Sequence, residues 1–593
     1  MAITEPSKTQ SSESYLYTEL IESYLGKRAA FISSILISYG RLTSKEISKK
    51  AKLPVSVVKK TLVSLIQLNC VSIWNDVSSR TPTTHYYFKE SGALQLLYSG
   101  EIIAYVDKLY HNDSLTQIIT NFLSLGNLTI SEYISSFGSN DKEAIYNLEK
   151  NFATLVSDKF LIPITKYNFS PILDLWLTTY KKAYQKIPKT STLSELKRKS
   201  EAKAVAKLEF LKLLEHEPEN LHIKDKTTSL TKINPTISLS FNIERFLKHK
   251  RSVQLSKFCA HRVGNITSII YECSLLATEK NSPSVKNPLH QIELSNEEFE
   301  DPKSYEPKTS CTFNARDVLK FLPKDLDLKN TVLNGPPPKR KNSDSEPRGG
   351  GKRIKLEDGF AATNGNGDSH NNGNNDDEDD EFDIGTSTIT IVEQHLKILS
   401  TSVIPFLKKA SNGLYYVPFP ELSSILHKAV YDAVLSSTLG PPCSRILRCV
   451  RDNRLVSEKL INSVALLKEK DARSLTSLLV KYNSLQIQEI PKSADRAASK
   501  SVFLFRFNEK HSFNFLKNNI CWNIGQLFEK IDFLKQENAS LLAKANREDV
   551  KGKESELLLA SELTQLKQVQ DRELESVVKI NRLVSIWEVF KFF

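Results

Sequence analysis

The side chains whose types and spacing could do chemistry in this sequence are basic ones, and the chemistry they indicate is phosphate binding. Six lysines follow closely on one another along two predicted helices near the start of the chain: Lys45, Lys49, Lys50, Lys52, Lys59 and Lys60. Lysines grouped on helices can hold a nucleic acid backbone without reading its bases. We therefore take Lys49, Lys50, Lys59 and Lys60 as candidate DNA contacts. The alternative is a solvated surface without a ligand.

A second basic group lies further along the chain and is weaker evidence for the same chemistry. It comprises Lys248, Lys250, Arg251, Lys257 and Arg262. From this group we take Arg251 and Arg262 as further candidate DNA contacts, again with a solvated surface as the alternative.

Two short basic clusters stand in a stretch rich in proline, glycine and asparagine. The first is Lys339, Arg340 and Lys341, and the second contains Lys352, Arg353 and Lys355. Two such clusters with a short spacer are typical of a bipartite nuclear import signal, so we expect the protein in the nucleus.

Catalytic chemistry has no support in the sequence. It contains no Walker A, HExxH, GxSxG or Rossmann glycine motif, and its 11 histidines lack metal-ligand spacing. The seven cysteines are scattered without a CxxC pair, which favours reduced thiols. We expect no catalytic residue, metal or cofactor. No apolar run is long enough for a membrane span, and the net charge of +12 permits a polyanionic partner.

The elements that must position these residues follow one repeated pattern. An apolar helix ends, an apolar residue follows, and a Ser or Thr then caps a second helix. The four copies are GRLTSKEI (40–47), GNLTISEY (126–133), RSVQLSKF (251–258) and NRLVSEKL (453–460). Repeats of this kind identify a building block. With a third helix and two wing strands after it, each copy predicts a winged helix.

The fold class expected is mainly α with small β-hairpins. Its predicted parts are winged helices at 14–90, 92–165, 237–440 and 441–508, and a basic helical connector at 166–236. The third winged helix carries a polar insertion, 280–385, predicted to be disordered because it has too few apolar residues to offset ordering entropy. The third helices of the second and fourth units carry acids, which suits protein contacts better than DNA.

The C-terminal part, 512–593, has a different periodicity. Apolar residues step by four and three from Leu527 to Ala545 and again from Leu559, with a charged, glycine-containing stretch between them. This predicts an antiparallel coiled-coil hairpin. The alternative is one long helix.

Three segments carry a resemblance to a known family: VKKTLVSLIQLNCV (58–71), GLYYVPFPEL (413–422) and EIPKSADRAASKSVFLF (489–505). With the order of the predicted domains, they resemble the winged-helix subunit of RNA polymerase III, the largest member of its specific heterotrimer, related to transcription factor IIE alpha. The resemblance implies a noncatalytic subunit of a nucleotidyltransferase complex. It also implies docking on the clamp of the polymerase core, binding to two smaller heterotrimer subunits, and support of promoter-directed initiation and DNA opening.

Two rival functions stay open at this stage. Winged helices also serve as protein docks, so the chain could be a scaffold subunit of an assembly outside transcription. It could also be a free-standing DNA-binding regulator. A regulator would bind DNA alone with sequence preference, whereas a scaffold would not bind DNA.

Overall fold

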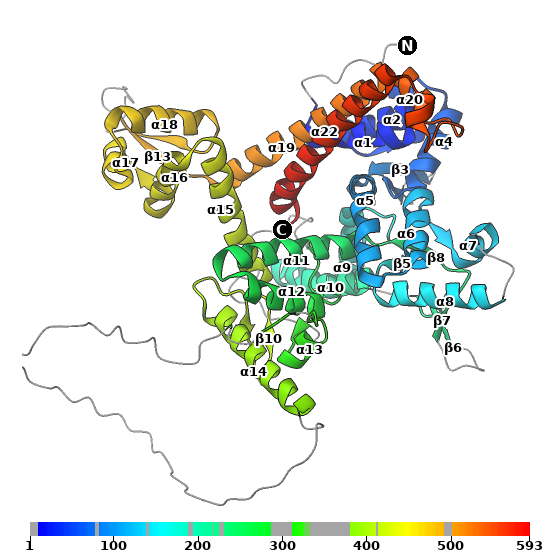
Figure 1. Cartoon of the computed structure of the whole chain (residues 1–593), viewed down its shortest axis with the longest axis horizontal. Helices are drawn as coiled ribbons and strands as arrows, with labels where there is room; N and C mark the ends of the chain where they lie inside the picture. Colours follow the sequence, from blue (N-terminus) through cyan, green and yellow to red (C-terminus); the bar gives the residue numbers. More distant parts are fainter. Residues whose placement is uncertain are drawn as a thin grey trace, which may run out of the picture. The chain divides into compact units, whose positions relative to one another are not determined.

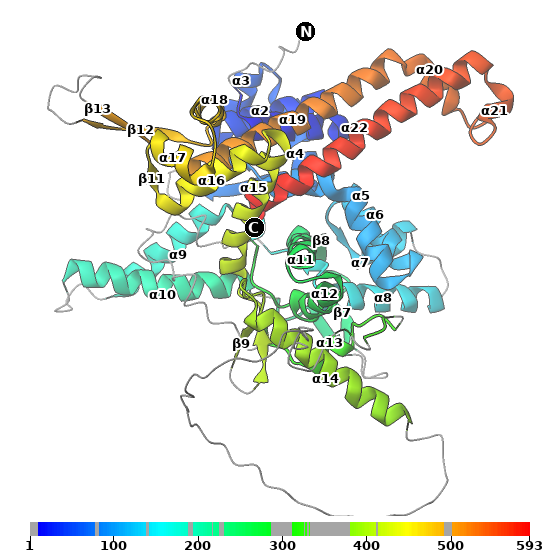
Figure 2. The same cartoon turned by 60° about the vertical axis from the view of Figure 1, so that its left-hand side comes forward.

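The structure is a computed structural model of the chain. It describes residues 10–593 apart from 77–81, 138–141, 166, 188–193, 216–217, 225–230, 286–310, 325, 329–330, 332–379, 411–412 and 492–500. Two compact units emerge, one formed by 1–255, 279–306 and 419–593, the other by 256–278 and 307–418. Both units are mainly helical, and each contains one or more small antiparallel sheets (Figures 1 and 2). This confirms the predicted fold class.

The first winged helix starts with α2 (Lys27–Tyr39), which ends at Gly40 with a positive φ of 73°. Its other elements are β1 (Leu42–Thr43), α3 (Ser44–Ala51), α4 (Val55–Gln67), β2 (Val71–Asp76) and β3 (Thr83–Phe88). The strands are antiparallel in the order β1-β3-β2. Apolar side chains at helical spacing, such as Ile32, Ile47 and Leu62, meet in one core.

The second winged helix repeats this order but completes its sheet late. Its first elements are α6 (Asp113–Leu125), β4 (Leu128–Thr129), α7 (Ile130–Phe137), α8 (Lys142–Ser157) and β5 (Leu161–Pro163). The last strand is β8 (Ser238–Phe241), which lies between β4 and β5 and pairs with both. The sheet therefore extends past the predicted boundary at 165. The segment 166–236 lies between two strands of one sheet, instead of joining two domains.

That inserted segment holds two long helices and a small hairpin. They are α9 (Ile172–Lys186), α10 (Glu195–Glu215), β6 (His222–Lys224) and β7 (Thr231–Ile233). The two helices lie side by side (Figure 2), and Trp176 of α9 meets Phe210 of α10 edge to face at 5.6 Å. This contact gives the insertion an aromatic core of its own.

The fourth winged helix has the same strand order as the first. It consists of α16 (Pro441–Asn453), β11 (Leu455–Val456), α17 (Glu458–Ala465), α18 (Glu469–Lys481), β12 (Gln486–Pro491) and β13 (Ser501–Arg506). The sheet runs β11-β13-β12, and a core around Ile446, Leu447 and Leu479 fixes the helices to it.

The second compact unit contains the third winged helix. Its elements are α12 (Asn265–Glu279), α13 (Ala315–Leu319), α14 (Asp380–Thr401), β9 (Lys408–Lys409) and β10 (Tyr415–Tyr416). Phe313 forms an isolated antiparallel β-bridge with Tyr415. This bridge corresponds to the pairing of β1 with β3 in the first winged helix. The segment predicted as a disordered insertion, 280–385, thus includes an ordered strand residue and a helix. Buried Phe313 and Val318 supply the apolar contacts that hold them.

The third copy of the repeat was placed wrongly in the sequence. Residues 251–258 lie inside one unbroken helix, α11 (Ile243–Arg262). The equivalent position is Phe313, followed by Asn314 at the N-cap of α13, where Asn314 and Asp317 form a capping box. Asn and Asp replace the Thr and Glu of the first copy but make the same hydrogen bonds.

The C-terminal part is an antiparallel helical hairpin, as predicted. It contains α19 (Glu509–Glu537), α20 (Ala539–Ala545), α21 (Glu554–Leu557) and α22 (Ala560–Phe592). Two ion pairs cross between its arms in antiparallel register, Lys535–Glu573 at 2.8 Å and Lys544–Glu562 at 2.7 Å. Buried Leu541 and Leu566 pack between the arms.

Three further helices complete the first unit: α1 (Ser12–Leu25), α5 (Glu90–Tyr110) and α15 (Phe419–Thr438). The ring of Tyr15 on α1 stacks on Trp522 of α19 at 4.5 Å. At the end of α22, Trp587 is fully buried and Lys591 pairs with Glu13 of α1 at 2.8 Å. The first and last helices of the chain therefore share one core.

Candidate nucleic-acid interface

The local sequence of the first winged helix decides how α3 and α4 present their lysines. Thr43 and Glu46 form a capping box that starts α3, with the Glu46 carboxylate accepting from the Thr43 amide at 2.8 Å. Lys52 ends α3 in the left-handed conformation at φ 53°, and Pro54 at the N-cap then starts α4. The turn between the helices is short, so the two lysine-bearing segments follow each other closely.

All six lysines on these helices have exposed side chains; we call Lys45, Lys49, Lys50, Lys52, Lys59 and Lys60 the lysine face. Among the described residues, no carboxylate forms an ion pair with any of them. The Lys50 ammonium lies 3.5 Å from the ring centroid of Tyr39. These charges are therefore available to an external anion.

The surrounding segment has few acids that could compensate the lysine face. Between residues 27 and 76 there are nine lysines and arginines but only two acids, Glu46 and Asp76. The excess of seven charges exceeds half of the chain's net charge of +12. The Glu46 carboxylate accepts hydrogen bonds from Thr43, and these bonds lower its pKa. Glu46 is thus engaged in the helix cap.

The third helices of the second and fourth winged helices differ from α4. On α8, Glu149 pairs with Lys232 at 3.1 Å, so acid and base neutralise each other. On α18, Arg473 binds both Glu458 and Glu469 at 2.8 Å. A hollow at the start of α18 is lined by Glu469, Lys470, Arg473, Ser474 and Ser477.

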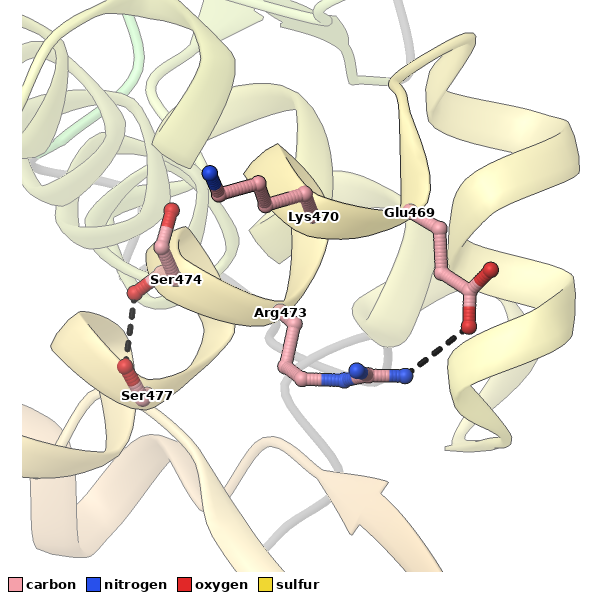
Figure 3. Close-up of a pocket in the computed structure, with 5 residues that line it drawn as sticks. All are labelled: Glu469, Lys470, Arg473, Ser474 and Ser477. Carbon is pink, nitrogen blue, oxygen red and sulfur yellow. Dashed lines mark hydrogen bonds and ion pairs between the residues drawn. The ribbon is translucent and has the colours of Figure 1, made fainter.

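Figure 3 shows why this hollow is a weak anion site. The guanidinium of Arg473 is directed toward Glu469, and Lys470 points away from that pair. The Ser477 hydroxyl donates to the backbone carbonyl of Ser474 at 2.7 Å, and the Ser474 hydroxyl donates to the Asp471 carbonyl at 2.9 Å. With a carboxylate at the rim and its arginine already engaged, the hollow offers one unpaired cation at most among the residues that line it.

The structure contradicts the assignment of Arg251 to DNA. Its side chain is buried, with 5% of the residue exposed, and it donates to Ser282 Oγ at 3.0 Å. The guanidinium also lies 3.8 Å from the ring centroid of Phe419. Arg251 therefore holds α11 against neighbouring segments and cannot reach a phosphate without local unfolding.

Most of the second basic group is internal for similar reasons. Lys250 pairs with Glu101 at 2.6 Å and with buried Glu588 at 3.1 Å. Lys248 donates to the Ser282 carbonyl at 2.6 Å, and burial lowers its pKa to about 8. Arg262 at the end of α11 is exposed, with its guanidinium 5.6 Å from the Phe258 ring centroid. Only Arg262 of the two predicted arginines is thus accessible.

The basic clusters assigned to nuclear import, Lys339 to Lys341 and Lys352 to Lys355, lie outside the described residues. All seven cysteines are buried. Within the described part of the chain, no three His, Cys, Asp or Glu side chains gather as metal ligands. None of the described helices is long and apolar enough to cross a bilayer.

Sequence reasoning missed the aromatic and apolar neighbours of the lysine face. Tyr39 is 61% exposed beneath Lys50, and Val63 on α4 is 67% exposed beside the lysines of that helix. Tyr39 could have been noticed because it directly precedes Gly40, the residue that ends α2. Val63 lies outside the buried positions of α4, such as Val58, Leu62 and Leu65, and this departure from the apolar spacing could have indicated an exposed apolar residue. Together these residues give the lysine face some apolar surface next to its charge.

Four family models match successive parts of the chain. They are RNA polymerase III subunit RPC82 (150–426), the helix-turn-helix domain of that subunit (15–76), the C-terminal winged-helix domain of POLR3C (431–507), and the helical hairpin domain of DNA-directed RNA polymerase III subunit RPC3 (540–591). The matches of 15–76 and 431–507 overlap the first and fourth winged helices, that of 540–591 covers the later part of the hairpin, and that of 150–426 runs from α8 into α15.

Whole proteins are similar over almost the full length. DNA-directed RNA polymerase III subunit RPC3 of Saccharomyces cerevisiae (strain ATCC 204508 / S288c) is 42% identical, covering 98% of this chain and 94% of the relative. The protein of the same name from Kluyveromyces lactis is also 42% identical, covering 99% of this chain and 94% of the relative. That of Candida albicans is 38% identical, covering 99% and 98%.

Proposed function

The chain belongs to the RPC3 (RPC82) family of RNA polymerase III subunits, and on that premise we propose that it holds promoter DNA through the lysine face of its first winged helix. The observation that carries this proposal is six exposed lysines on α3 and α4 without a described counter-ion. Lysines of this kind bind phosphates and release counter-ions, which favours association with any DNA sequence.

The remaining parts of the proposed function concern assembly. The subunit is noncatalytic, docks on the clamp of the polymerase core, and binds two smaller subunits of a heterotrimer in the nucleus. From there the first winged helix supports promoter-directed initiation and DNA opening. Resemblance to the family and the mixed or paired charges of α8 and α18 support protein contacts for the second and fourth winged helices.

The test changes Lys49, Lys50, Lys59 and Lys60 to Ala in the full chain. The slope of log affinity against log salt for a DNA duplex should decrease in magnitude by roughly 3 to 4, at about 0.9 per lost phosphate contact. The loss should be similar for unrelated sequences, because phosphates carry no base identity. A matched control changes four exposed lysines of the C-terminal hairpin: Lys530, Lys551, Lys553 and Lys567.

Several outcomes separate the proposal from its rivals. Tagged chain, wild type or variant, should retain the large polymerase subunits on affinity purification, and the α3–α4 variant should reduce promoter-directed transcription. An unchanged salt slope in a folded variant would reject the lysine face as a DNA contact. Failure to retain polymerase would favour a scaffold outside transcription, and sequence preference of the isolated chain would favour a regulator.

A further inference from the structure

The wing of the second winged helix is far larger than the wings of the first and fourth. In the first, the wing strands are joined between Asp76 and Thr83, and in the fourth between Pro491 and Ser501. In the second, the chain leaves the sheet at Pro163 and returns only at Ser238. The α9–α10 hairpin therefore occupies the place of a wing tip, an element that in winged helices extends from the sheet beside the third helix.

This enlarged wing has a packed structure of its own. Trp176, Ala183, Ala206 and Phe210 are buried between α9 and α10, and Tyr180 stacks against Trp176 at 6.3 Å. The guanidinium of Arg198 on α10 lies 4.6 Å from the ring centroid of Tyr184 on α9. A hairpin held by such contacts fixes the backbone from which its surface lysines extend, which lowers the entropy cost of binding a ligand.

The hairpin carries a large excess of positive charge. Its described residues from 181 to 212 include nine lysines and arginines and three glutamates. Two of the glutamates are already paired, Glu195 with Lys199 at 2.8 Å and Glu209 with Lys186 at 2.7 Å. Four other lysines are exposed and have no ion-pair partner in the described part of the chain: Lys181, Lys182, Lys197 and Lys212.

The third helix of the same domain does not share this charge. On α8, Lys142 and Lys150 are matched by Glu143 and Glu149, so the helix has no net charge. The second winged helix therefore has its cationic surface on its wing. We propose that the α9–α10 hairpin is an enlarged wing that binds the phosphate backbone of nucleic acid.

The spacing of the lysines favours a polyanion as the ligand. Lys197 and Lys212 stand fifteen residues apart on one helix, or about 22 Å at 1.5 Å per residue. Over that length a DNA duplex carries on the order of a dozen phosphates. A charge array of this length fits a continuous backbone better than a single acidic side chain or a short acidic cluster.

The base of the hairpin is tied to the first winged helix, so bound nucleic acid would be held by a rigid support. Asp174 of α9 pairs with Arg41 at 3.3 Å and accepts from the Tyr87 hydroxyl at 3.0 Å. The amide of Ile73 in β2 donates to the Phe169 carbonyl at 2.7 Å. The proposal adds a surface to the lysine face without depending on it, because the lysines involved are different.

The test changes Lys181, Lys182, Lys197 and Lys212 to Ala in the full chain. We expect duplex affinity in low salt to decrease at least tenfold, and the salt slope to decrease in magnitude by roughly 2 to 4, at about 0.9 per lost contact. Replacement of the same four lysines by Arg should restore most of the affinity, because Arg keeps the charge. The control is the Lys530, Lys551, Lys553 and Lys567 variant, which loses the same charge elsewhere.

Each result decides the proposal. Retained affinity and slope in a variant with unchanged circular dichroism would overturn it. So would retained DNA binding combined with loss of polymerase subunits on affinity purification, which would identify an acidic protein surface as the ligand. If DNA affinity falls in this variant but not in the α3–α4 variant, the hairpin is supported as a DNA contact and the lysine face is rejected. The two proposals can therefore fail separately.

Discussion

Glu19 lies in a group of acids where α1 packs against α19, and its titration can be tested. Burial and the nearby charges of Glu22, Glu529 and Asp532 raise the pKa of Glu19 to about 7 from an ordinary value of 4.5. Folding therefore favours the protonated carboxyl. The stability gained from that protonation is present below pH 4.5 and is lost as the pH rises through about 7.

We expect Glu19→Gln to raise the unfolding temperature at pH 8 and to have little effect at pH 4.5. The substitution keeps the shape of the side chain and removes the charge. Because the carboxyl is partly exposed and solvent screens its charge, the gain at pH 8 should be only on the order of 1 kcal/mol. Thermal unfolding of both proteins at the two pH values measures it, with Glu548→Gln, an exposed glutamate of the C-terminal hairpin, as the control. An effect of equal size at both pH values would contradict the pKa of Glu19.

Single basic residues show where sequence reasoning is weakest. Lys59 and Lys60 were predicted correctly as exposed because the apolar spacing of α4 assigns Val58 and Leu62 to the core. Arg251 was assigned to a surface because its sequence neighbours are basic. Its environment is set instead by Phe419 and Ser282, and Phe419 is distant in the sequence. The composition around Arg251 cannot predict a contact with a residue so distant in the sequence.

At the scale of elements, Gly525 is a position where α1 and α19 approach each other closely. A Cβ at this position would lie 2.5 Å from Cδ1 of Tyr15, whose residue is 1% exposed. Tyr15 is further fixed by its hydrogen bond to Glu529 at 2.5 Å. The side chain has little freedom to move away, so an added methyl group would separate the two helices.

We expect Gly525→Ala to destabilise the protein by about 1 kcal/mol, because an overpacking cost of about 1 to 3 kcal/mol exceeds the gain in helix propensity. Gly100→Ala is the matched control, since Gly100 lies in α5 with nothing within 4 Å of its added Cβ. The control should stabilise by roughly 0.5 to 1 kcal/mol. Chemical denaturation of both variants decides it, and a stabilised Gly525→Ala protein would show that the helices can shift.

The short elements could be predicted where their signals are local. At Thr43, Thr129 and Ser457 the repeat marks a residue whose hydroxyl accepts from the amide three residues on, at the start of a helix. The third copy was predicted wrongly because a Ser in the middle of α11 cannot be distinguished by residue type from a Ser at an N-cap. The equivalent cap at Asn314 uses different residue types for the same hydrogen bonds.

At the scale of the whole molecule, the sheet of the second winged helix could not be predicted from a window of sequence. Leu128 of β4 pairs with Leu239 of β8 across a long insertion, and β8 itself is only four residues long. A short strand becomes stable here because it pairs on both sides and buries Leu239 and Phe241. That stabilisation depends on residues far away in the sequence, so the boundary at 165 was set too early.

The last prediction concerns nuclear import, which depends on sequence alone because its residues lie outside the described part of the chain. Changing Lys339, Arg340, Lys341, Lys352, Arg353 and Lys355 to Ala should move a fluorescently tagged protein toward the cytoplasm, since basic clusters of this kind are bound as import signals.

A polymerase subunit can also enter the nucleus with its partners. A fusion of residues 336–358 to a cytoplasmic reporter separates the two routes, because the fragment lacks the winged helices and the hairpin. Nuclear accumulation of the fusion, lost on the same substitutions, would establish the signal. A control changes the exposed hairpin lysines Lys530, Lys551, Lys553 and Lys567 to Ala in the full chain. A fusion that stays cytoplasmic would show that these clusters do not suffice for import.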